Sequence, residues 1–367
     1  MTEPEPLEFI GHTCVRYRGR KLVFFSGCDY FRMARHPQVL AAARASLRED
    51  GLGVAASRLT TGNHARYAEL EHDLARFFGA EDALLVSTGY LSDTIVGQAL
   101  AGRFSHALID SQAHPALQDT ARFLDCPVLR FQHRDAEDVG RAAQRCGPGA
   151  RLILLTDGMF SRDGAAAPLA AYLHVLPRDA WLLVDDAHGA GVLGHTGKGT
   201  LEHEGVARRR IIQTVTLSKA FGAYGGAILG SRALRRRILE RSGMFVGSTP
   251  IPLPLLRAAG QSLRLLSATP GYRRRLVDNS AFVKTALRAA GWEVADLPGP
   301  IVMLAPKPAV AAKLKSALLG AGIYPPFLRY PGGPANGYFR FVISSEHSQS
   351  QLDSLVRVLS VFGKSAR

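Results

Sequence analysis

Short apolar runs alternate with segments of helical periodicity over the first two thirds of the chain. Residues 65–78, 91–101 and 136–145 have apolar positions three and four apart, which is the spacing of an amphipathic helix. Continuous apolar strands that alternate with helices predict an α/β domain, with a mostly parallel seven-stranded sheet and helices on both faces. The seven runs expected to be strands are residues 83–87, 106–110, 128–131, 151–156, 181–186, 211–218 and 226–230.

The pattern changes after about residue 245. Residues 251–266 and 272–291 have the length and period of long helices, and the last helix is expected at 350–362. Apolar runs at 301–306 and 338–344 are typical of strands, so this part predicts a smaller α+β domain. The expected parts are an N-terminal segment, 1–35, that packs on the small domain, a large domain, 36–245, and a small C-terminal domain, 246–367.

The composition is ordinary for a soluble globular protein. The chain has 367 residues, of which 47% are hydrophobic and 21% charged. It has no apolar run of about 18 residues, and the first residues, "MTEPEPLEFIGHTC", lack a signal-peptide core, so we expect a cytoplasmic protein that does not enter a membrane. The four cysteines lie far apart, which argues against a zinc site or a disulfide framework, and no metal is expected.

The net charge of +14 leaves two kinds of partner open. A basic chain can bind nucleic acid, and it suits an anionic partner such as coenzyme A or an acidic carrier protein equally well. The densest arginine clusters, at 208–210 and 235–237, are typical of solvated helix faces. We therefore expect no nucleic acid, and a non-catalytic nucleic-acid-binding protein remains the least favoured alternative.

Ligands of open parallel sheets bind outside the carboxyl ends of the strands, where several ionisable residues recur. Lys219 follows the run at 211–218. Burial there would lower its pKa and make it an amine nucleophile, although a solvated or ion-paired lysine is the usual alternative. Asp185 ends the run at 181–186 and precedes His188; such a carboxylate can keep a heterocyclic nitrogen protonated, or simply cap a helix.

Three further segments add to this set. "STGYLSDTIVGQALAG", which contains Thr88, Gly89 and Tyr90, predicts a strand end, a turn and a helix whose first amides could bind a phosphate, although a plain turn would look the same. His114 follows another strand end and could stack on a ring or be structural. Ser161 lies in a loop that could equally be a simple turn. Together, the lysine, aspartate, histidines and phosphate-type turn fit pyridoxal 5′-phosphate (PLP).

The chain resembles the α-oxoamine synthase family of PLP-dependent fold type I enzymes. The resemblance extends from "FFSGCDYFRMARHPQV" to "YFRFVISSEHS". It rests on "ASRLTTG", "STGYLSD", "DSQAHPAL", "TDGMFSRDGAAAPL", "VDDAHGAGVLGHTGKG", "TVTLSKAFGAYGG" and "STPIP", which occur in the family's order and spacing. It implies the fold type I architecture with a smaller C-terminal domain.

The resemblance also implies roles around the cofactor ring. Lys219 is similar to the lysine that forms the Schiff base and later acts as general base. Asp185 matches the partner of the pyridine nitrogen, and His114 matches the imidazole stacked on the ring. His188 and Ser161 match the hydrogen-bond partners of the phenolic oxygen.

Other matching positions concern the phosphate and the oligomer. Thr88, Gly89 and Tyr90 match the phosphate-binding turn, and Thr216 matches a hydroxyl that binds the phosphate. Thr249 matches the residue that reaches the phosphate of a neighbouring subunit. A homodimer with shared active sites is therefore implied.

The implied reaction condenses a small amino acid with an acyl thioester of coenzyme A or a carrier protein, usually with decarboxylation, to give an α-aminoketone. Arg340 matches the arginine that binds the amino acid's carboxylate. "ASRLTTG" is closest to the oxononanoate synthase branch, which implies alanine and a pimeloyl thioester in biotin synthesis. Glycine with acetyl-CoA, or another acyl donor, stays open. An aminotransferase or carbon–sulfur lyase of the same fold is less favoured.

Four positions depart from the family pattern near the expected substrate site. Cys28 and Asp93 stand where asparagine is usual, Arg32 stands in place of a glycine, and Arg134 replaces the asparagine of a His-Asn-Asp motif. They leave the cofactor residues intact. From charge alone, we hypothesise that Arg32 and Arg134 recognise a different anionic acyl donor.

Overall fold

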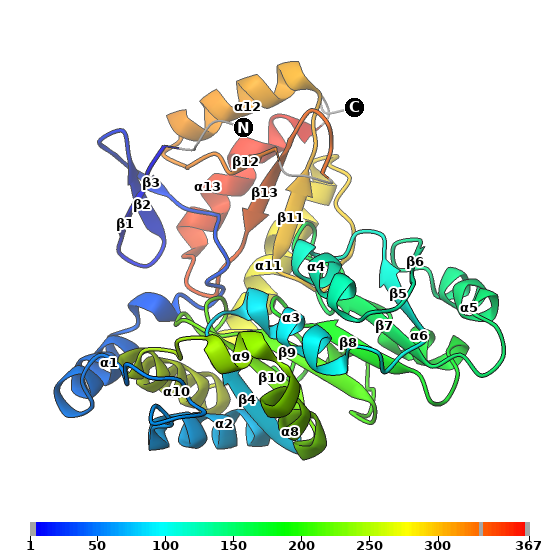
Figure 1. Ribbon diagram of the computed structural model, residues 1–367. Helices are drawn as coiled ribbons and strands as arrows, with labels where there is room; N and C mark the ends of the chain where they lie inside the picture. Colours follow the sequence, from blue (N-terminus) through cyan, green and yellow to red (C-terminus); the bar gives the residue numbers. More distant parts are fainter. Residues whose placement is uncertain (1–4, 330–332, 364–367) are drawn as a thin grey trace. The chain divides into compact units, whose positions relative to one another are not determined.

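The computed structural model describes residues 5–329 and 333–363 (Figure 1). Contacts divide these residues into a large unit, 36–160 and 165–269, and a small unit formed by 161–164 and by the described parts of 1–35 and 270–367. The division falls between Thr269 and Pro270 and not after residue 245, where the sequence placed it. The reason is that α10 (Leu253–Ala268) packs against α1 (Pro37–Glu49) and α2 (Ala65–Phe78) in the large unit.

The large unit contains the predicted seven-stranded sheet, in the order β4-β10-β9-β8-β7-β5-β6. Neighbouring strands are parallel except around β10, which is antiparallel to both β9 and β4. The prediction of a mostly parallel sheet is therefore confirmed. The strands are β4 (Asp82–Val86), β5 (His106–Asp110), β6 (Val128–Phe131), β7 (Leu152–Asp157), β8 (Trp181–Asp185), β9 (Ile211–Thr216) and β10 (Gly226–Gly230).

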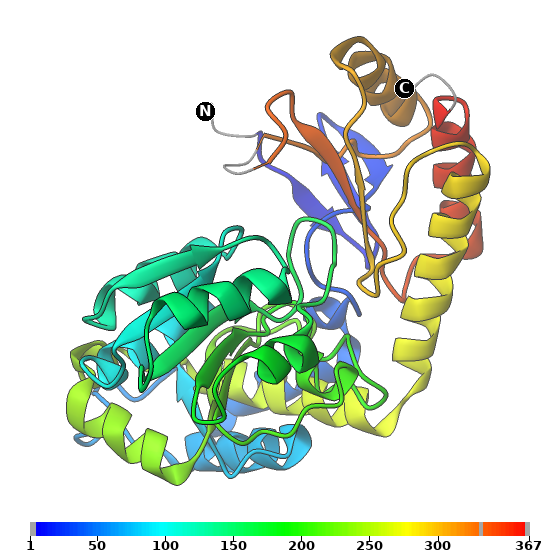
Figure 2. The same ribbon diagram turned by 90° about the vertical axis from the view of Figure 1, so that its right-hand side faces the viewer.

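Helices cover the sheet (Figure 2). Every residue of β7 and of β9 is buried, which requires that both faces of these strands are covered. The helix α3 (Gly89–Leu100) begins two residues before the predicted start, because Thr88 caps it by accepting a hydrogen bond from the Leu91 amide. The other helices of this unit are α4 (Pro115–Phe123), α5 (Ala136–Arg145), α6 (Leu169–Val175), α7 (Thr200–His203), α8 (Arg232–Arg241) and α9 (Gly243–Gly247).

One apolar core fixes α3 on the sheet. Ile95 and Val96 of α3 are fully buried and belong to the same cluster as Leu155, Leu183 and Ile212 of the central strands. Burial of each such side chain stabilises the fold by about 1.5–3 kcal/mol. The start of α3 is therefore held firmly at the carboxyl edge of the sheet.

The small unit has two three-stranded sheets. β1 (Glu8–Ile10), β2 (Cys14–Tyr17) and β3 (Arg20–Val23) form one, and β11 (Ile301–Leu304), β13 (Tyr338–Val342) and β12 (Phe327–Leu328) form the other, in that order. The Val23 amide donates to the Gly322 carbonyl at 2.8 Å, so the N-terminal segment is bonded to the C-terminal part. The remaining elements are a short 3-10 helix at Met33–Arg35 and the helices α11 (Gly271–Ala289), α12 (Pro308–Gly320) and α13 (Gln349–Ser360). Across the described residues of both units, every helix is too short or too polar to cross a membrane.

Candidate active site

The carboxyl ends of the central strands bring the predicted chemical groups to one edge of the large unit. The register of the parallel strands pairs Asp185 of β8 with Thr214 of β9 and with Asp157 of β7. Strand β9 ends at Thr216, shortly before Lys219. The lysine and both aspartates therefore lie at the edge where open parallel sheets bind ligands.

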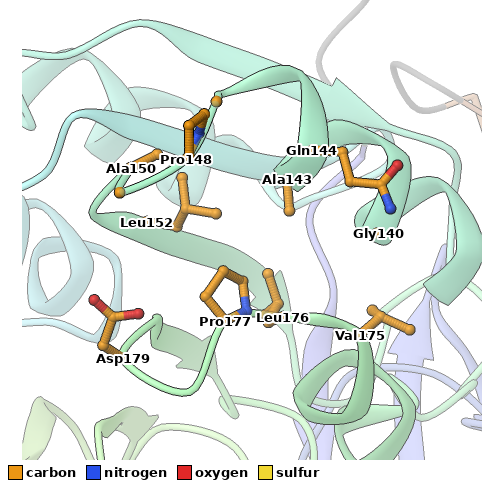
Figure 3. A pocket seen from close by; sticks show the side chains of 12 residues that line it. Gly140, Ala143, Gln144, Pro148, Ala150, Leu152, Val175, Leu176, Pro177 and Asp179 are labelled. Atoms are coloured by element: carbon orange, nitrogen blue, oxygen red, sulfur yellow. The ribbon is translucent and has the colours of Figure 1, made fainter.

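A surface hollow of the large unit lies at the opposite end of the same strands. It is formed between α5 and α6 (Figure 3), and its lining includes Leu152, the first residue of β7, together with Ala143 and Pro177. The lining is mainly apolar and contains none of the residues predicted for catalysis. The predicted chemistry therefore lies outside this hollow.

Lys219 lies in the turn that joins β9 to β10. The Leu217 amide donates to the Gly225 carbonyl, and the Gly222 amide donates to the Lys219 carbonyl, both at 2.9 Å. The Lys219 side chain is half-buried, so its desolvation is smaller than a fully buried strand end would give. Burial lowers the pKa of His114, and the positive charge of Lys219 lowers it further, so the amine lies near the His114 ring at this edge.

His114 is held by bonds at its main chain and its ring. Its amide donates to Oδ2 of Asp157 at 2.8 Å, and its Nδ1 accepts from the Ala116 amide at 3.2 Å, which caps α4. Burial lowers the pKa of the imidazole, against the opposing effect of the Asp185 charge. A neutral ring in a fixed orientation is thus present beside Asp185, as stacking on a cofactor would require.

The expected phosphate-binding residues meet at the start of α3. Gly89 packs directly on Thr216, because a Cβ atom at Gly89 would lie 2.7 Å from the Thr216 Cβ. The Thr216 hydroxyl lies 2.7 Å from that of Ser218. The amides in the first turn of a helix have no acceptor within the helix. The first amides of α3 and the hydroxyls of Thr216 and Ser218 are therefore donors that lie together here. This donor set suits a phosphate.

Tyr90 uses its side chain elsewhere. Its hydroxyl donates to Oδ2 of Asp119 at 2.5 Å, and its ring meets the His114 ring edge-on, with centroids 6.1 Å apart. The predicted contribution of Tyr90 to phosphate binding concerns only its main-chain amide. The side-chain contacts instead restrain His114.

His188 is buried in the loop after β8, and Asp186 holds that loop. Oδ1 of Asp186 accepts from the Thr200 hydroxyl at 2.6 Å, while Oδ2 accepts from the Thr200 amide at 2.8 Å and from Nε2 of Gln213 at 2.6 Å. Burial raises the pKa of Asp186 to about 6. Asp186 therefore stabilises the loop that contains His188.

Ser161 and Arg340 belong to the small unit and contact each other. Nε of the buried Arg340 donates to the Ser161 carbonyl at 2.6 Å, and its terminal nitrogens lie 3.8 and 3.9 Å from Sγ of Cys28. Two residues predicted for one site, which are 179 positions apart in the sequence, are thus joined within one unit. Cys28, a departure from the family pattern, is one neighbour of this guanidinium.

Thr249 lies on the exposed surface of the large unit. It lines a small hollow with Ser87, Arg58 and Tyr67. The hollow therefore adjoins the segment between β4 and α3, where the phosphate donors lie. Exposure of Thr249 is compatible with its predicted reach toward a neighbouring subunit.

The two arginine departures have intramolecular partners. Arg32 is buried, and its Nη2 donates to the Phe24 carbonyl at 3.0 Å. Nε of Arg134 donates to the Ala166 carbonyl at 2.9 Å, and its amide donates to Oδ2 of Asp110 at 3.0 Å. These contacts weaken the hypothesis that both side chains recognise an anionic acyl donor, and Arg32 is the poorer candidate because it is buried.

Sequence reasoning did not assign the supporting roles of Asp157 and Asp186. The first was visible as a strand-end residue and the second as part of the Asp-Asp pair that ends an apolar run. Their partners, the His114 amide and the Thr200 hydroxyl, are distant in sequence. No group of His, Cys, Asp and Glu among the described residues is arranged to hold a metal ion.

Comparisons with known proteins agree with this architecture. Residues 21–359 match the family model of the aminotransferases of class I and II. The 8-amino-7-oxononanoate synthase of Thioalkalivibrio sulfidiphilus is 36% identical over 345 residues, which are 93% of this chain and 88% of that protein. The serine palmitoyltransferase of Sphingomonas wittichii superposes with a TM-score of 0.92 at 27% identity, covering 100% of this chain and 94% of that one.

A serine palmitoyltransferase of S. paucimobilis, solved with a bound PLP–myriocin aldimine, also has a TM-score of 0.92, at 25% identity over 100% of this chain and 94% of that chain. The fold is that of a fold type I, PLP-dependent transferase. The chain belongs to the aminotransferase class I and II family and, within it, to the α-oxoamine synthases, which are PLP-dependent acyltransferases.

Proposed function

We propose that this chain condenses alanine with a pimeloyl thioester to give an α-aminoketone, and releases carbon dioxide and the free thiol. The observation that carries the proposal is the 36% identity to an 8-amino-7-oxononanoate synthase over 93% of the chain. The site supports it, because amine, carboxylate, imidazole and phosphate-type donors share one sheet edge.

Lys219 is proposed to hold PLP through its Nζ. When bound, PLP supplies an electron sink that stabilises negative charge at the α-carbon of the amino acid. The free Lys219 amine takes the α-proton as general base, and its half-buried position leaves it able to exchange protons. Asp185 keeps the ring nitrogen protonated, which the electron sink requires.

Other residues would orient the cofactor. His114, fixed as a neutral ring, would stack on it, and His188 and Ser161 would donate to its phenolic oxygen. The phosphate would take the amides of Gly89 and Tyr90 and the hydroxyl of Thr216, and Thr88 fixes the helix start that presents the amides.

Arg340 is proposed to bind the carboxylate of the amino acid. Its Nε is engaged by the Ser161 carbonyl, which fixes the plane of the guanidinium. The terminal nitrogens face Sγ of Cys28, and a thiol is a weak acceptor that a carboxylate displaces readily. A planar guanidinium suits bidentate binding of a carboxylate.

We propose a homodimer in which Thr249 serves the neighbouring active site. Apolar side chains are exposed close to Thr249, with Leu52 exposed at 74% and Val246 at 39%. The Ser57 hydroxyl donates to the Val246 carbonyl at 2.7 Å. This bond joins the segment that contains Leu52 and Ser57 to the segment that contains Val246 and Thr249. A second copy would remove this apolar surface from water.

The test is the visible absorption spectrum of the purified protein, titrated separately with alanine, glycine and serine. A yellow protein whose band responds to alanine, and which then releases thiol from a pimeloyl thioester, is the expected result. Coenzyme A and carrier-protein thioesters are compared with that amino acid, and Lys219→Ala is the control without cofactor chemistry.

Other results would replace the proposal with a named alternative. A response to glycine with thiol release from acetyl-CoA would indicate a glycine acetyltransferase, and a response to serine would indicate a different branch. Transfer of the amino group to a 2-oxo acid without thiol release would indicate an aminotransferase.

A further inference from the structure

A second carboxyl group lies beside Asp185, on α3. Asp93 is fully buried, and its Oδ1 accepts a hydrogen bond of 2.6 Å from the Thr214 hydroxyl. Thr214 is the register partner of Asp185 on the adjacent strand, so the side chains of both residues leave the sheet on the same face. Asp93 approaches that face because α3 packs against β9 and β10.

The Thr214 hydrogen bond and the strand register place the carboxyl groups of Asp93 and Asp185 beside each other, and burial and then the negative charge of Asp185 raise the pKa of Asp93. The remaining oxygen of Asp93, Oδ2, is buried and receives no N–H or O–H donor from the protein. Two ionised carboxylates cannot share a hydrogen bond, because neither has a proton to donate. The contact is favourable only when one of the two groups is protonated.

The surroundings favour the proton on Asp93. Burial raises its pKa well above the usual range, and the negative charges of Asp185 and Asp157, on β8 and β7, raise it further. The Thr214 hydroxyl has an opposing effect that is smaller than that of burial. Asp185, in contrast, accepts from the Ala187 amide at 3.0 Å, a contact that suits a carboxylate.

We propose that Asp93 is a positioning residue for the cofactor: it donates a hydrogen bond from its protonated carboxyl to Asp185 and so fixes the carboxylate intended for the ring nitrogen of PLP. The inference rests on the role proposed for Asp185. It assigns a function to one of the four departures from the family pattern. Because the protonated Asp93 carboxyl is neutral, it orients Asp185 without adding a second negative charge beside the cofactor ring.

The direct test is infrared spectroscopy of the purified holoprotein at pH 8. A protonated carboxyl has a carbonyl stretching band that an ionised one lacks. Burial and the Asp185 charge also raise the pKa of Asp157 well above its usual range, so Asp157 can contribute to this band as well. The component of the band that belongs to Asp93 is expected to disappear in Asp93→Asn. Asp186→Asn is the matched control, because Asp186 is also buried but accepts hydrogen bonds from Thr200 and Gln213 and has a pKa of about 6.

The second test measures PLP affinity of the apoprotein and the pH titration of the visible band. Asp93→Asn keeps a neutral donor for Asp185 and an acceptor for Thr214, so both properties are expected to stay within about threefold and 0.3 pH units of wild type. Asp93→Ala removes the donor, and the PLP dissociation constant is expected to rise roughly 10-fold or more. The thermal unfolding of both apoproteins separates this loss from a general loss of stability.

The proposal is overturned if the wild-type protein has no band that Asp93→Asn removes. It is also overturned if Asp93→Asn weakens PLP binding as much as Asp93→Ala while both apoproteins remain stable. These outcomes differ from failure of the proposed function, which would appear as a wild-type protein that binds no PLP, because the infrared band of Asp93 can be measured in the apoprotein as well.

Discussion

Thr200 and Asp186 are joined by two hydrogen bonds, one from the Thr200 hydroxyl at 2.6 Å and one from its amide at 2.8 Å. The contact closes the loop between β8 and α7, which contains His188. Glycines make room for it: a Cβ atom at Gly189 or Gly199 would lie 2.0 or 1.9 Å from an Asp186 oxygen. The loop is therefore shaped around this carboxylate.

Asp186→Ala should destabilise the large unit. The substitution leaves the Thr200 amide and hydroxyl and the Gln213 side chain without their buried acceptor, at a cost of about 2–4 kcal/mol in the free energy of unfolding. Urea unfolding measures it. Asp186→Asn should cost less, because its amide oxygen still accepts and the Thr200 hydroxyl can accept in turn; equal losses in the two variants would contradict this account.

Lys219→Ala should remove the visible band of bound PLP and lower turnover by about 10³-fold or more, since both covalent attachment and the general base are lost. The measurement combines the absorption spectrum with thiol release from the acyl donor. Lys313→Ala, an exposed substitution on α12, is the control and should match wild type. A yellow, active Lys219→Ala protein would show that another residue carries the cofactor.

Arg340→Lys should raise the KM for the amino acid roughly 10- to 100-fold with a smaller change in the KM for the acyl donor. A lysine cannot bind a carboxylate through two parallel N–H groups, and it loses the contact that fixes the guanidinium plane. Initial rates at varied concentrations of each substrate measure the two constants. Arg357→Lys, an exposed substitution on α13, is the control. An unchanged KM for the amino acid would exclude this role for Arg340.

His347 should make the small unit sensitive to acid. Burial, and then the nearby charge of Arg32, lower its pKa to about 3, and its Nδ1 accepts from the Ser344 amide at 3.0 Å. An unfolded histidine has a pKa of about 6.5, so between pH 6.5 and 3 the unfolded state binds the extra proton and stability falls as the pH falls. The slope from this one group is at most about 1.4 kcal/mol per pH unit.

The check is urea unfolding at pH 7 and pH 5 for wild type and His347→Asn, whose amide oxygen can accept from Ser344. The variant should lose less stability between the two pH values than wild type does. His12→Asn, at an exposed position, should retain the wild-type pH dependence. The same loss in His347→Asn as in wild type would assign the acid sensitivity to other groups.

The sequence alone determined the seven strands of the large unit and the edge at which its chemical groups lie. Both follow from local properties, since apolar period sets the strands and parallel strands place their carboxyl ends together. Asp185 was identifiable because it ends an apolar run, and Lys219 because it directly follows one. The glycine-containing turn at Gly89 was identifiable for the same reason.

Tertiary structure alone decided which residues support these groups. Asp93 and Thr214 are 121 residues apart, and Ser161 and Arg340 are 179 apart. Such contacts depend on strand register and on how a helix packs on a sheet, neither of which a local pattern contains. The same limit applies to α10, which has an ordinary helical period but packs in the large unit because α1 and α2 offer it an apolar surface.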